Sequence, residues 1–134
     1  MAKTSEKRLL QAIVALACLV PLTYGSFGVL LGPRWLRGVP LFDVPVDLDS
    51  HFHYLSGIFL GVGIAFTTCV PDIEIKGPRF RLLGSFVVLG GLSRLFSLIV
   101  DGVPSHGQQL GLCMELIVVP CLLLWQASLA KRWP

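Results

Sequence analysis

Residues 9–31 read LLQAIVALACLVPLTYGSFGVLL, a run that contains no charged side chain. About 20 predominantly apolar residues in a helix are enough to cross the hydrocarbon core of a bilayer. The run therefore predicts a first transmembrane helix, kinked at Pro21 because proline lacks a backbone donor. A cleaved signal peptide is the alternative, but its apolar core would be shorter than this run.

The whole chain has the same apolar character. Of its 134 residues, 54% are hydrophobic and only 14% are charged, whereas soluble domains carry about 25% charged residues. So few charged residues cannot cover a surface that faces water. The chain also lacks the basic stripe or basic helix of a nucleic-acid-binding protein. We therefore expect an integral membrane protein with membrane lipid, and no nucleic acid, among its partners.

Three further apolar segments follow, and each ends at a proline, a glycine or a group of charged residues. They predict helices at about residues 50–70, 79–101 and 108–130, in addition to the first at about 9–31. The expected fold is all-α, a four-helix transmembrane bundle that forms a single domain over residues 1–134. We expect the loop 32–49 to lie along the membrane interface, anchored by Trp35. Asp49 or Ser50 is expected to cap the second helix.

The basic residues predict the orientation of this bundle. With four spans, both termini and the turn at 72–78 lie on one side of the membrane. That side carries eight Lys and Arg residues: Lys3, Lys7, Arg8, Lys76, Arg79, Arg81, Lys131 and Arg132. The opposite side carries Arg34 and Arg37. Because cytoplasmic loops are enriched in Lys and Arg, we expect both termini to be cytoplasmic.

Two opposite charges interrupt the last two apolar segments. Arg94 lies seven residues before the outer end of the third predicted helix, and Glu115 lies seven residues after the outer end of the fourth. At 1.5 Å per residue, both lie about 10 Å below the outer surface. An unpaired charge at that depth costs several kcal/mol, so we expect them to pair. The pair either fixes the register of the helices or lines a pocket.

Other polar side chains are predicted at a similar depth. His53 and Tyr54 begin the second helix, and Tyr24 lies in the outer part of the first. Together with Arg94 and Glu115, they form the expected polar cluster. If both histidines are helical, His51 is about 200° from His53, and the two cannot chelate one metal ion. No metal site is expected; the alternative, a site formed by His51, Asp49 and His106 across two outer loops, has no support from their spacing. The cofactor is unknown. His51 and His106 are expected to be solvated, and the four cysteines to be small core residues.

Glycines mark faces where helices can approach one another closely. Gly57 and Gly61 form a G-x-x-x-G pair on the second helix, and Gly90 and Gly91 lie on the third. Such small residues let two transmembrane helices pack with their backbones close together. We therefore expect these four glycines to be helix-packing positions.

Three stretches carry a family resemblance. They are Asp49-Ser50-His51-Phe52-His53-Tyr54-Leu55-Ser56-Gly57, Arg79-Phe80-Arg81-Leu82-Leu83 with Gly90-Gly91-Leu92-Ser93-Arg94, and Met114-Glu115-Leu116 with Pro120 and Leu124-Trp125-Gln126. Together they resemble a bacterial family of small four-helix membrane proteins of unknown function, which is distantly similar to the DoxX-like proteins. The resemblance implies a fold and a location in the bacterial inner membrane. It implies no activity.

Two functions remain open. The first is an accessory or assembly subunit that packs against a larger membrane complex, favoured by the glycine-rich faces and the lack of a self-sufficient catalytic set. The alternative is a binding protein or enzyme for a lipid, quinone or other small apolar molecule, whose polar head the cluster would hold. The direction of Gly57 and Gly61 discriminates between them. Outward-facing glycines favour a partner helix, and inward-facing glycines beside a cavity favour a ligand.

Overall fold

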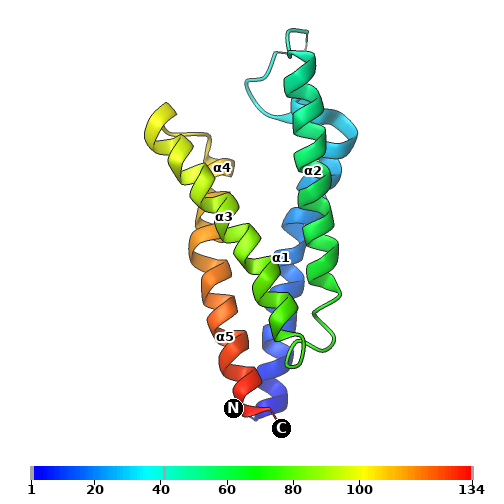
Figure 1. Ribbon diagram of the computed structural model, residues 1–134, viewed down its shortest axis with the longest axis vertical. Helices are drawn as coiled ribbons and strands as arrows, with labels where there is room; N and C mark the ends of the chain where they lie inside the picture. Colours follow the sequence, from blue (N-terminus) through cyan, green and yellow to red (C-terminus); the bar gives the residue numbers. More distant parts are fainter. Residues whose placement is uncertain (1, 41, 134) are drawn as a thin grey trace. The chain divides into compact units, whose positions relative to one another are not determined.

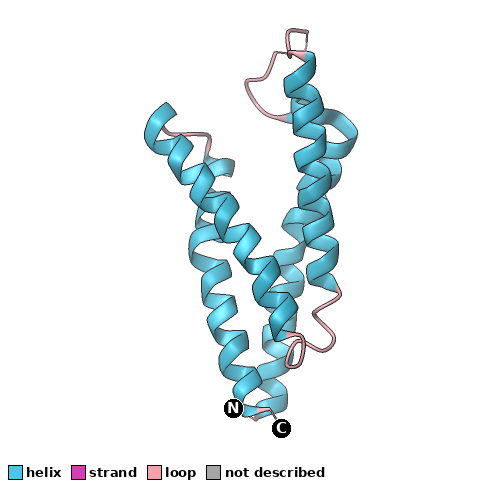
Figure 2. Ribbon diagram, in the orientation of Figure 1, coloured by secondary structure: helices cyan, strands magenta, loops and turns pink. Residues whose placement is uncertain are grey.

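The structure is a computed structural model that describes residues 2–40 and 42–133. Its elements are α1 (Lys3–Leu31), the 3-10 turn η1 (Gly32–Trp35), α2 (Val46–Thr67), α3 (Gly77–Asp101), α4 (His106–Cys113), the π-turn η2 (Met114–Val118) and α5 (Val119–Arg132). The last three follow one another without a break, so the described residues form four long helices and no strand (Figure 2). The prediction of an all-α fold with four helices is confirmed.

Three of the four helices are long and apolar enough to cross a membrane. They are Lys3–Trp35, Gly77–Asp101 and His106–Arg132. α2 is not among them, although residues 50–70 were predicted to span. Its first half carries two aspartates, two histidines and a tyrosine, and these polar groups offset its later apolar residues. A membrane crossing by α2 therefore stays a prediction.

α2 also begins earlier than predicted. It starts at Val46 and is preceded by Pro45, which occupies the N-cap position without a capping side chain. The prediction that Asp49 or Ser50 caps this helix is wrong, because Asp47 and Asp49 lie inside its first turn. Carboxylates in the first turn interact favourably with the positive end of the helix dipole. The loop before α2 is correspondingly shorter than predicted, its position along the membrane interface stays a prediction, and Leu41 within it lies outside the described residues.

The chain divides into two compact units. One comprises residues 1–11 with 71–134, and the other comprises residues 12–70. The first unit therefore contains the start of α1 together with α3, α4, η2 and α5. The second contains the remainder of α1, η1 and α2.

In the second unit, α1 and α2 pack through small residues (Figure 1). A Cβ added to Gly25 would lie 2.9 Å from the Cα of Leu60, and one added to Gly28 would lie 2.6 Å from the Cβ of Ser56. From α2, a Cβ on Gly63 would lie 2.9 Å from the Cβ of Pro21. The two backbones thus approach as closely as small residues allow.

In the first unit, α3 packs against α5 and η2. A Cβ at Gly84 would lie 2.8 Å from Leu123 Cδ1, and a Cβ at Gly91 would lie 2.7 Å from Glu115 Cβ. Gln126 on α5 is fully buried, and its Nε2 donates to the carbonyl oxygen of Ile73 at 2.7 Å. The close contacts at Gly84 and Gly91 set the distance between the helices. The hydrogen bond from Gln126 connects the turn that precedes α3 to α5.

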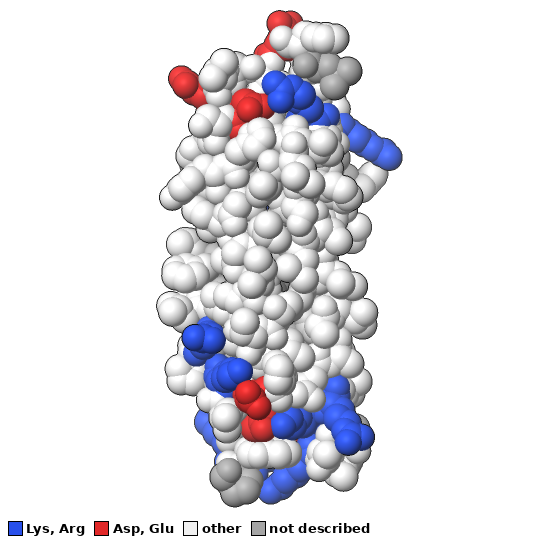
Figure 3. Space-filling view, turned by 90° about the vertical axis from the view of Figure 1, so that its right-hand side faces the viewer, with Lys and Arg blue, Asp and Glu red and all other residues white. Residues whose placement is uncertain are grey.

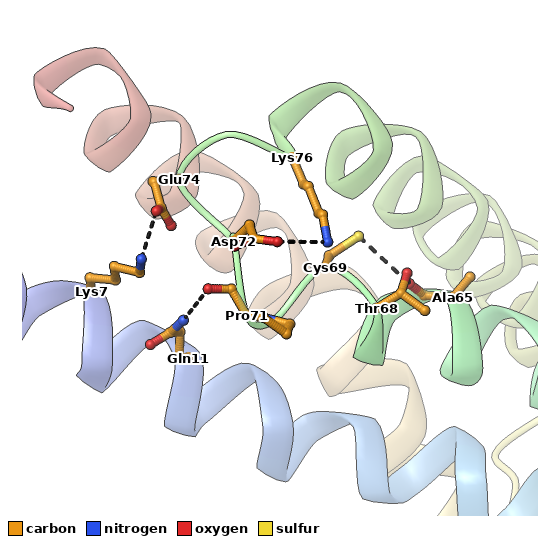
Figure 4. Close-up of polar contacts among 9 residues, drawn as sticks. All are labelled: Lys7, Gln11, Ala65, Thr68, Cys69, Pro71, Asp72, Glu74 and Lys76. Atoms are coloured by element: carbon orange, nitrogen blue, oxygen red, sulfur yellow. Dashed lines mark hydrogen bonds and ion pairs between the residues drawn. The ribbon is translucent and has the colours of Figure 1, made fainter. Parts of the chain in front are cut away.

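Ion pairs join the two termini with the turn at 71–76, and all of them lie in the first unit. Arg132 forms a bidentate pair with Glu6, with nitrogen–oxygen distances of 2.9 and 2.6 Å, and Trp125 donates to the same carboxylate. Lys7 pairs with Glu74 at 2.6 Å, and Gln11 donates to the carbonyl oxygen of Pro71 (Figure 4). The three segments therefore lie together, as predicted, while their side of the membrane stays a prediction.

The charges of α1 are confined to its first residues. Lys3, Glu6, Lys7 and Arg8 are followed by no charged residue until Arg34, beyond the end of the helix. On the face drawn in Figure 3, most of the surface consists of uncharged residues, and the Lys, Arg, Asp and Glu side chains form small groups. An uncharged length of this kind suits hydrocarbon, with its charged ends in the headgroup regions.

Replacing Gln126 by leucine is expected to loosen the turn at 71–77. The Ile73 carbonyl would lose its donor in a buried place, at a cost of about 1 kcal/mol. Amide hydrogen exchange of the peptide covering residues 71–77 should become several-fold faster. Gln109→Leu is the matched control, since Gln109 Nε2 donates to the Pro104 carbonyl at 2.8 Å in the other loop. Unchanged exchange at 71–77 in Gln126→Leu would contradict this role.

Candidate functional site

Arg94 on α3 is the centre of a polar cluster in the first unit. Its Nε and Nη2 donate to the two carboxylate oxygens of Glu115 at 3.0 and 3.2 Å, and its Nη1 donates to Gln108 Oε1. The predicted pairing of Arg94 with Glu115 is thus confirmed. The side chain of Glu115 is 11% exposed and that of Arg94 is 35% exposed. The carboxylate is therefore enclosed, while part of the guanidinium remains open.

A break in helical geometry presents Glu115. In η2 the Val119 N–H donates to the Met114 carbonyl, five residues earlier, instead of to the residue four earlier. Pro120 follows directly, and its ring would clash with a carbonyl four residues before it in a regular helix. A π-turn is one way in which a helix accommodates such a residue, and π-turns are frequent at functional sites. The π-turn at Met114–Val118 thus lies just before this proline.

Gly91 and Gly111 make room for the pair. Gly91 is buried, and a Cβ there would lie 2.8 Å from Leu116 Cδ2 as well as meeting Glu115. At Gly111 on α4, a Cβ would lie 3.9 Å from the guanidinium carbon of Arg94. A larger residue at Gly91 would push η2 away from α3 and lengthen the ion pair. The helix-packing role predicted for Gly91 therefore matches its contacts.

The remaining residues of the predicted polar cluster belong to the second unit. Tyr24 lies on α1, and its ring packs edge-on against Trp35 with centroids 5.2 Å apart. Tyr54 on α2 is exposed, with its ring 6.4 Å from that of His51. Neither tyrosine contacts His53 through a hydrogen bond in the described residues. A single layer formed by all five residues therefore stays a prediction.

His53 has partners that sequence reasoning did not assign. Its Nδ1 lies 2.9 Å from the Asp49 carbonyl oxygen and 3.3 Å from Asp49 Oδ2. The other carboxylate oxygen of Asp49 accepts from Arg34 Nη1 at 2.9 Å. The i, i+4 spacing of Asp49 and His53 was the available signal. It was missed because α2 was expected to begin at Ser50.

Gly32 closes this second cluster. It has a φ of +64°, a conformation that glycine adopts without strain. A Cβ there would lie 2.6 Å from His53 Cε1 and 3.0 Å from Asp49 Oδ1. Because residue 32 is glycine, the chain can turn from α1 into η1 directly against the imidazole of His53. This turn places Arg34, in η1, next to Asp49.

Three of the four glycines predicted for helix packing face open space. A Cβ at Gly57, Gly61 or Gly90 would meet nothing within 4 Å, and all three residues are exposed. Within the chain, close approach is made instead by Gly25, Gly28, Gly63 and Gly84, as well as Gly91. Gly57, Gly61 and Gly90 therefore make no close helix contact within the described chain, and their role in helix packing stays a prediction. Their faces remain available for another molecule.

The described residues gather no group of three His, Cys, Asp or Glu side chains that would hold a metal ion. All four cysteines are free thiols. Cys18 and Cys69 are buried, but Cys113 and Cys121 are exposed, so the core placement expected for the latter two is wrong. His51 and His106 are exposed. What the two clusters offer chemically is hydrogen bonding and charge.

The Arg94–Glu115 cluster and the His53–Asp49 cluster both lie in the part of the chain that matches a family model. A family model described as a domain of unknown function, DUF4345, matches residues 9–126. The chain belongs to the DUF4345 family. The expected membership of a family of unknown function is thereby confirmed, while the distant similarity to DoxX-like proteins stays a prediction. The match spans Arg94, Glu115 and His53. No curated protein and no solved structure matched the chain.

The DUF4345 assignment and the apolar helices lead to the same coarse description. This is a small helical membrane protein of unknown function, whose apolar helices indicate a lipid environment. The family itself brings no reaction or ligand. Function must therefore be argued from the two clusters and from the glycines that face outward.

Proposed function

We propose that this DUF4345 protein is an accessory or assembly subunit of a larger complex in the bacterial inner membrane. It would bind that complex by packing the exposed face of α2 against an apolar transmembrane helix of another subunit. The single observation that carries the proposal is the open space at Gly57 and Gly61. By the criterion set from the sequence, glycines that face outward favour a partner helix.

The contrast with the other glycines of the second unit supports this reading. Gly25 and Gly28 show what close helix packing looks like in this chain, because a Cβ there would overlap α2. Gly57 and Gly61 have the same backbone geometry and the G-x-x-x-G spacing, but no neighbour. Glycine in a helix interior is destabilising by about 0.5–1 kcal/mol relative to alanine. A partner helix would compensate that cost through close contact.

The composition of α2 supports a protein partner more than a lipid one. Tyr54 and Ile58 flank the glycines on the same side of the helix, and Tyr54 is 65% exposed. α2 is also not among the three helices that are long and apolar enough to cross a membrane. Polar groups within a membrane helix are costly against hydrocarbon and favourable between helices. The partner expected here is therefore a helix whose contacting face is apolar and flat enough to meet the glycines.

Photo-crosslinking in native membranes tests the proposal. A benzoylphenylalanine placed at Ile58 should give a crosslink to one specific larger protein. The matched control is the same residue at Leu16 of α1, which is 66% exposed and should give no specific protein product. A product of twice the chain mass at Ile58, or the same products at both positions, would count against the accessory role.

A second candidate function rests on the Arg94 cluster. Arg94 has five N–H groups, of which three are used by Glu115 and Gln108. Its side chain is partly exposed at a depth of about 10 Å from the end of α3. Free donors at that depth favour a ligand with a polar acceptor and an apolar body. The proposed class is a lipid, a quinone or another small apolar molecule.

A further inference from the structure

Two N–H groups of Arg94 have no acceptor among the described residues. Glu115 accepts from Nε and from one Nη2 hydrogen, and Gln108 accepts from one Nη1 hydrogen. A guanidinium carries five N–H groups and stays protonated in proteins, so one hydrogen on each terminal nitrogen is left over. Both helices that hold the cluster are apolar enough to cross a membrane. Unused donors on a charged group are costly in such surroundings, which favours an acceptor from outside the chain.

Gly111 on α4 leaves a space directly against this guanidinium. A Cβ at Gly111 would lie 3.9 Å from Arg94 Cζ, which is an ordinary contact distance. Beyond its own stretch of helix, no other atom of the described residues lies within 4 Å of that position. A group of methyl size therefore fits beside the guanidinium without displacing the chain. The Arg94 side chain is 35% exposed, in agreement with an opening at this place.

The same side of α3 continues as an uncharged surface toward the middle of the span. Gly90, one turn before Arg94, is about 40° from it around the helix, and Val87, two turns before, is about 20° away. Gly90 is exposed, and a Cβ there would meet nothing within 4 Å, while Val87 is half-buried. Neither residue has a polar side chain. The body of a ligand held at Arg94 would therefore lie against an apolar part of this helix.

We propose that Arg94 binds the carbonyl oxygen of an uncharged amphiphile, such as a lipid ester or a quinone. A carbonyl oxygen only accepts hydrogen bonds, so it uses the free donors without leaving a hydrogen of its own unpaired. An anion suits the site less, because Glu115 already forms the ion pair with Arg94. The Glu115 carboxylate would repel a second negative charge across a medium of low dielectric constant. This inference names the ligand class of the second candidate function, on which it rests.

Probes that share an alkyl chain test the ligand class on the full chain in dodecyl maltoside, a detergent without a carbonyl group. Methyl decanoate and 2-decyl-1,4-benzoquinone should each shift the ¹⁵N signal of Arg94 Nε saturably. Undecane has no acceptor and should bind about tenfold more weakly, as expected for one lost hydrogen bond to a charged group. The decanoate anion should also bind more weakly than its methyl ester. Equal affinities for methyl decanoate and undecane, or tighter binding of decanoate, would overturn the proposal.

Substitutions assign the response to this site. The Arg94 Nε signal is identified by its loss in Arg94→Lys. Gly111→Ala places a methyl group in the open space at an ordinary distance from Arg94 Cζ, so it should fold normally and bind methyl decanoate several-fold more weakly. Gly61→Ala, whose Cβ meets nothing within 4 Å in the second unit, is the matched control and should bind as the unsubstituted chain does. Unchanged affinity in Gly111→Ala would overturn the site, and this comparison stands even if Arg94→Lys fails to fold.

The outcomes also separate this inference from the functions proposed above. Binding of the ester alone would identify a lipid as the source of the carbonyl, and binding of the quinone alone would identify a quinone; either result supports the proposal. Tighter binding of decanoate would overturn the ligand class but keep a ligand at Arg94. No saturable response to any probe would overturn the second candidate function as well. The accessory role is unaffected in every case, because the experiments use purified protein alone.

Discussion

Glu115→Gln is expected to lower the free energy of unfolding by about 2 kcal/mol. Removing one partner of a buried ion pair costs about 3–5 kcal/mol, because the other charge stays buried without compensation. The lower figure is appropriate here because the Arg94 side chain is 35% exposed. Unfolding by denaturing detergent in mixed micelles measures the loss, and the folded yield from membranes should fall with it.

A double-mutant cycle shows whether the loss belongs to the ion pair. Arg94→Met combined with Glu115→Gln removes both charges and should recover much of the stability lost in Glu115→Gln alone. Asp72→Asn is the matched control, since Asp72 pairs with Lys76 at 3.0 Å on an exposed turn. It should change stability by about 0.5 kcal/mol or less. Equal losses in the single and double variants would show that Arg94 and Glu115 do not stabilise one another.

Gly25→Ala should destabilise the chain by about 1–3 kcal/mol, the usual range for overpacking a close contact. Its new Cβ would lie 2.9 Å from the Cα, Cβ and N atoms of Leu60, two of which are backbone atoms that cannot move aside without shifting α2. Gly61→Ala is the matched control in the same pair of helices. Its Cβ meets nothing within 4 Å, so it should leave stability unchanged or raise it by up to about 1 kcal/mol.

The same two variants separate folding from association. We expect Gly61→Ala to fold normally in detergent but to associate less well with its partner in the membrane. Gly25→Ala loses stability even in isolation. Thermal unfolding of the purified proteins compares them directly. Equal destabilisation by both substitutions would mean that Gly61 lies in a packed intrachain contact.

Local sequence reasoning succeeded where one physical constraint was dominant. An uncharged apolar run as long as residues 9–31 predicts a transmembrane helix, and α1 contains the whole run. Arg94 and Glu115 could be paired because two charges at equal depth in hydrocarbon have few alternatives to one another. Gln108 and Glu115 are seven residues apart, a spacing that places both on one face of a helix, and in the structure Arg94 contacts both.

Where several local solutions were open, the sequence pattern was not enough. The G-x-x-x-G of α2 indicates a close-packing face but does not say which helix covers it. Within the chain, Gly25 and Gly28 of α1 meet α2 through Leu60 and Ser56 instead. Glu6 and Arg132 pair although they are 126 positions apart in the sequence, and helical periodicity cannot predict a contact at such a separation. Similarly, Arg34 reaches Asp49 only because Gly32 turns the chain.

The position of helix ends was the other source of error. Because α2 was placed at Ser50 instead of Val46, Asp49 was treated as a loop residue and its i, i+4 relation to His53 was not used. The π-turn at Met114–Val118 was likewise hidden, since a proline predicts a disturbance but not its form. Both errors lie at the polar clusters, where side-chain hydrogen bonds compete with regular helical geometry.

Native mass spectrometry of the protein, purified gently from its own membranes, tests whether it is an accessory subunit. We expect larger membrane subunits to be retained at a fixed stoichiometry, and Gly57→Leu with Gly61→Leu to release them while the variant still folds. A lone chain that carries one equivalent of a small molecule would contradict the accessory role. It would instead identify a ligand-binding protein, with the Arg94 cluster as the first site to substitute.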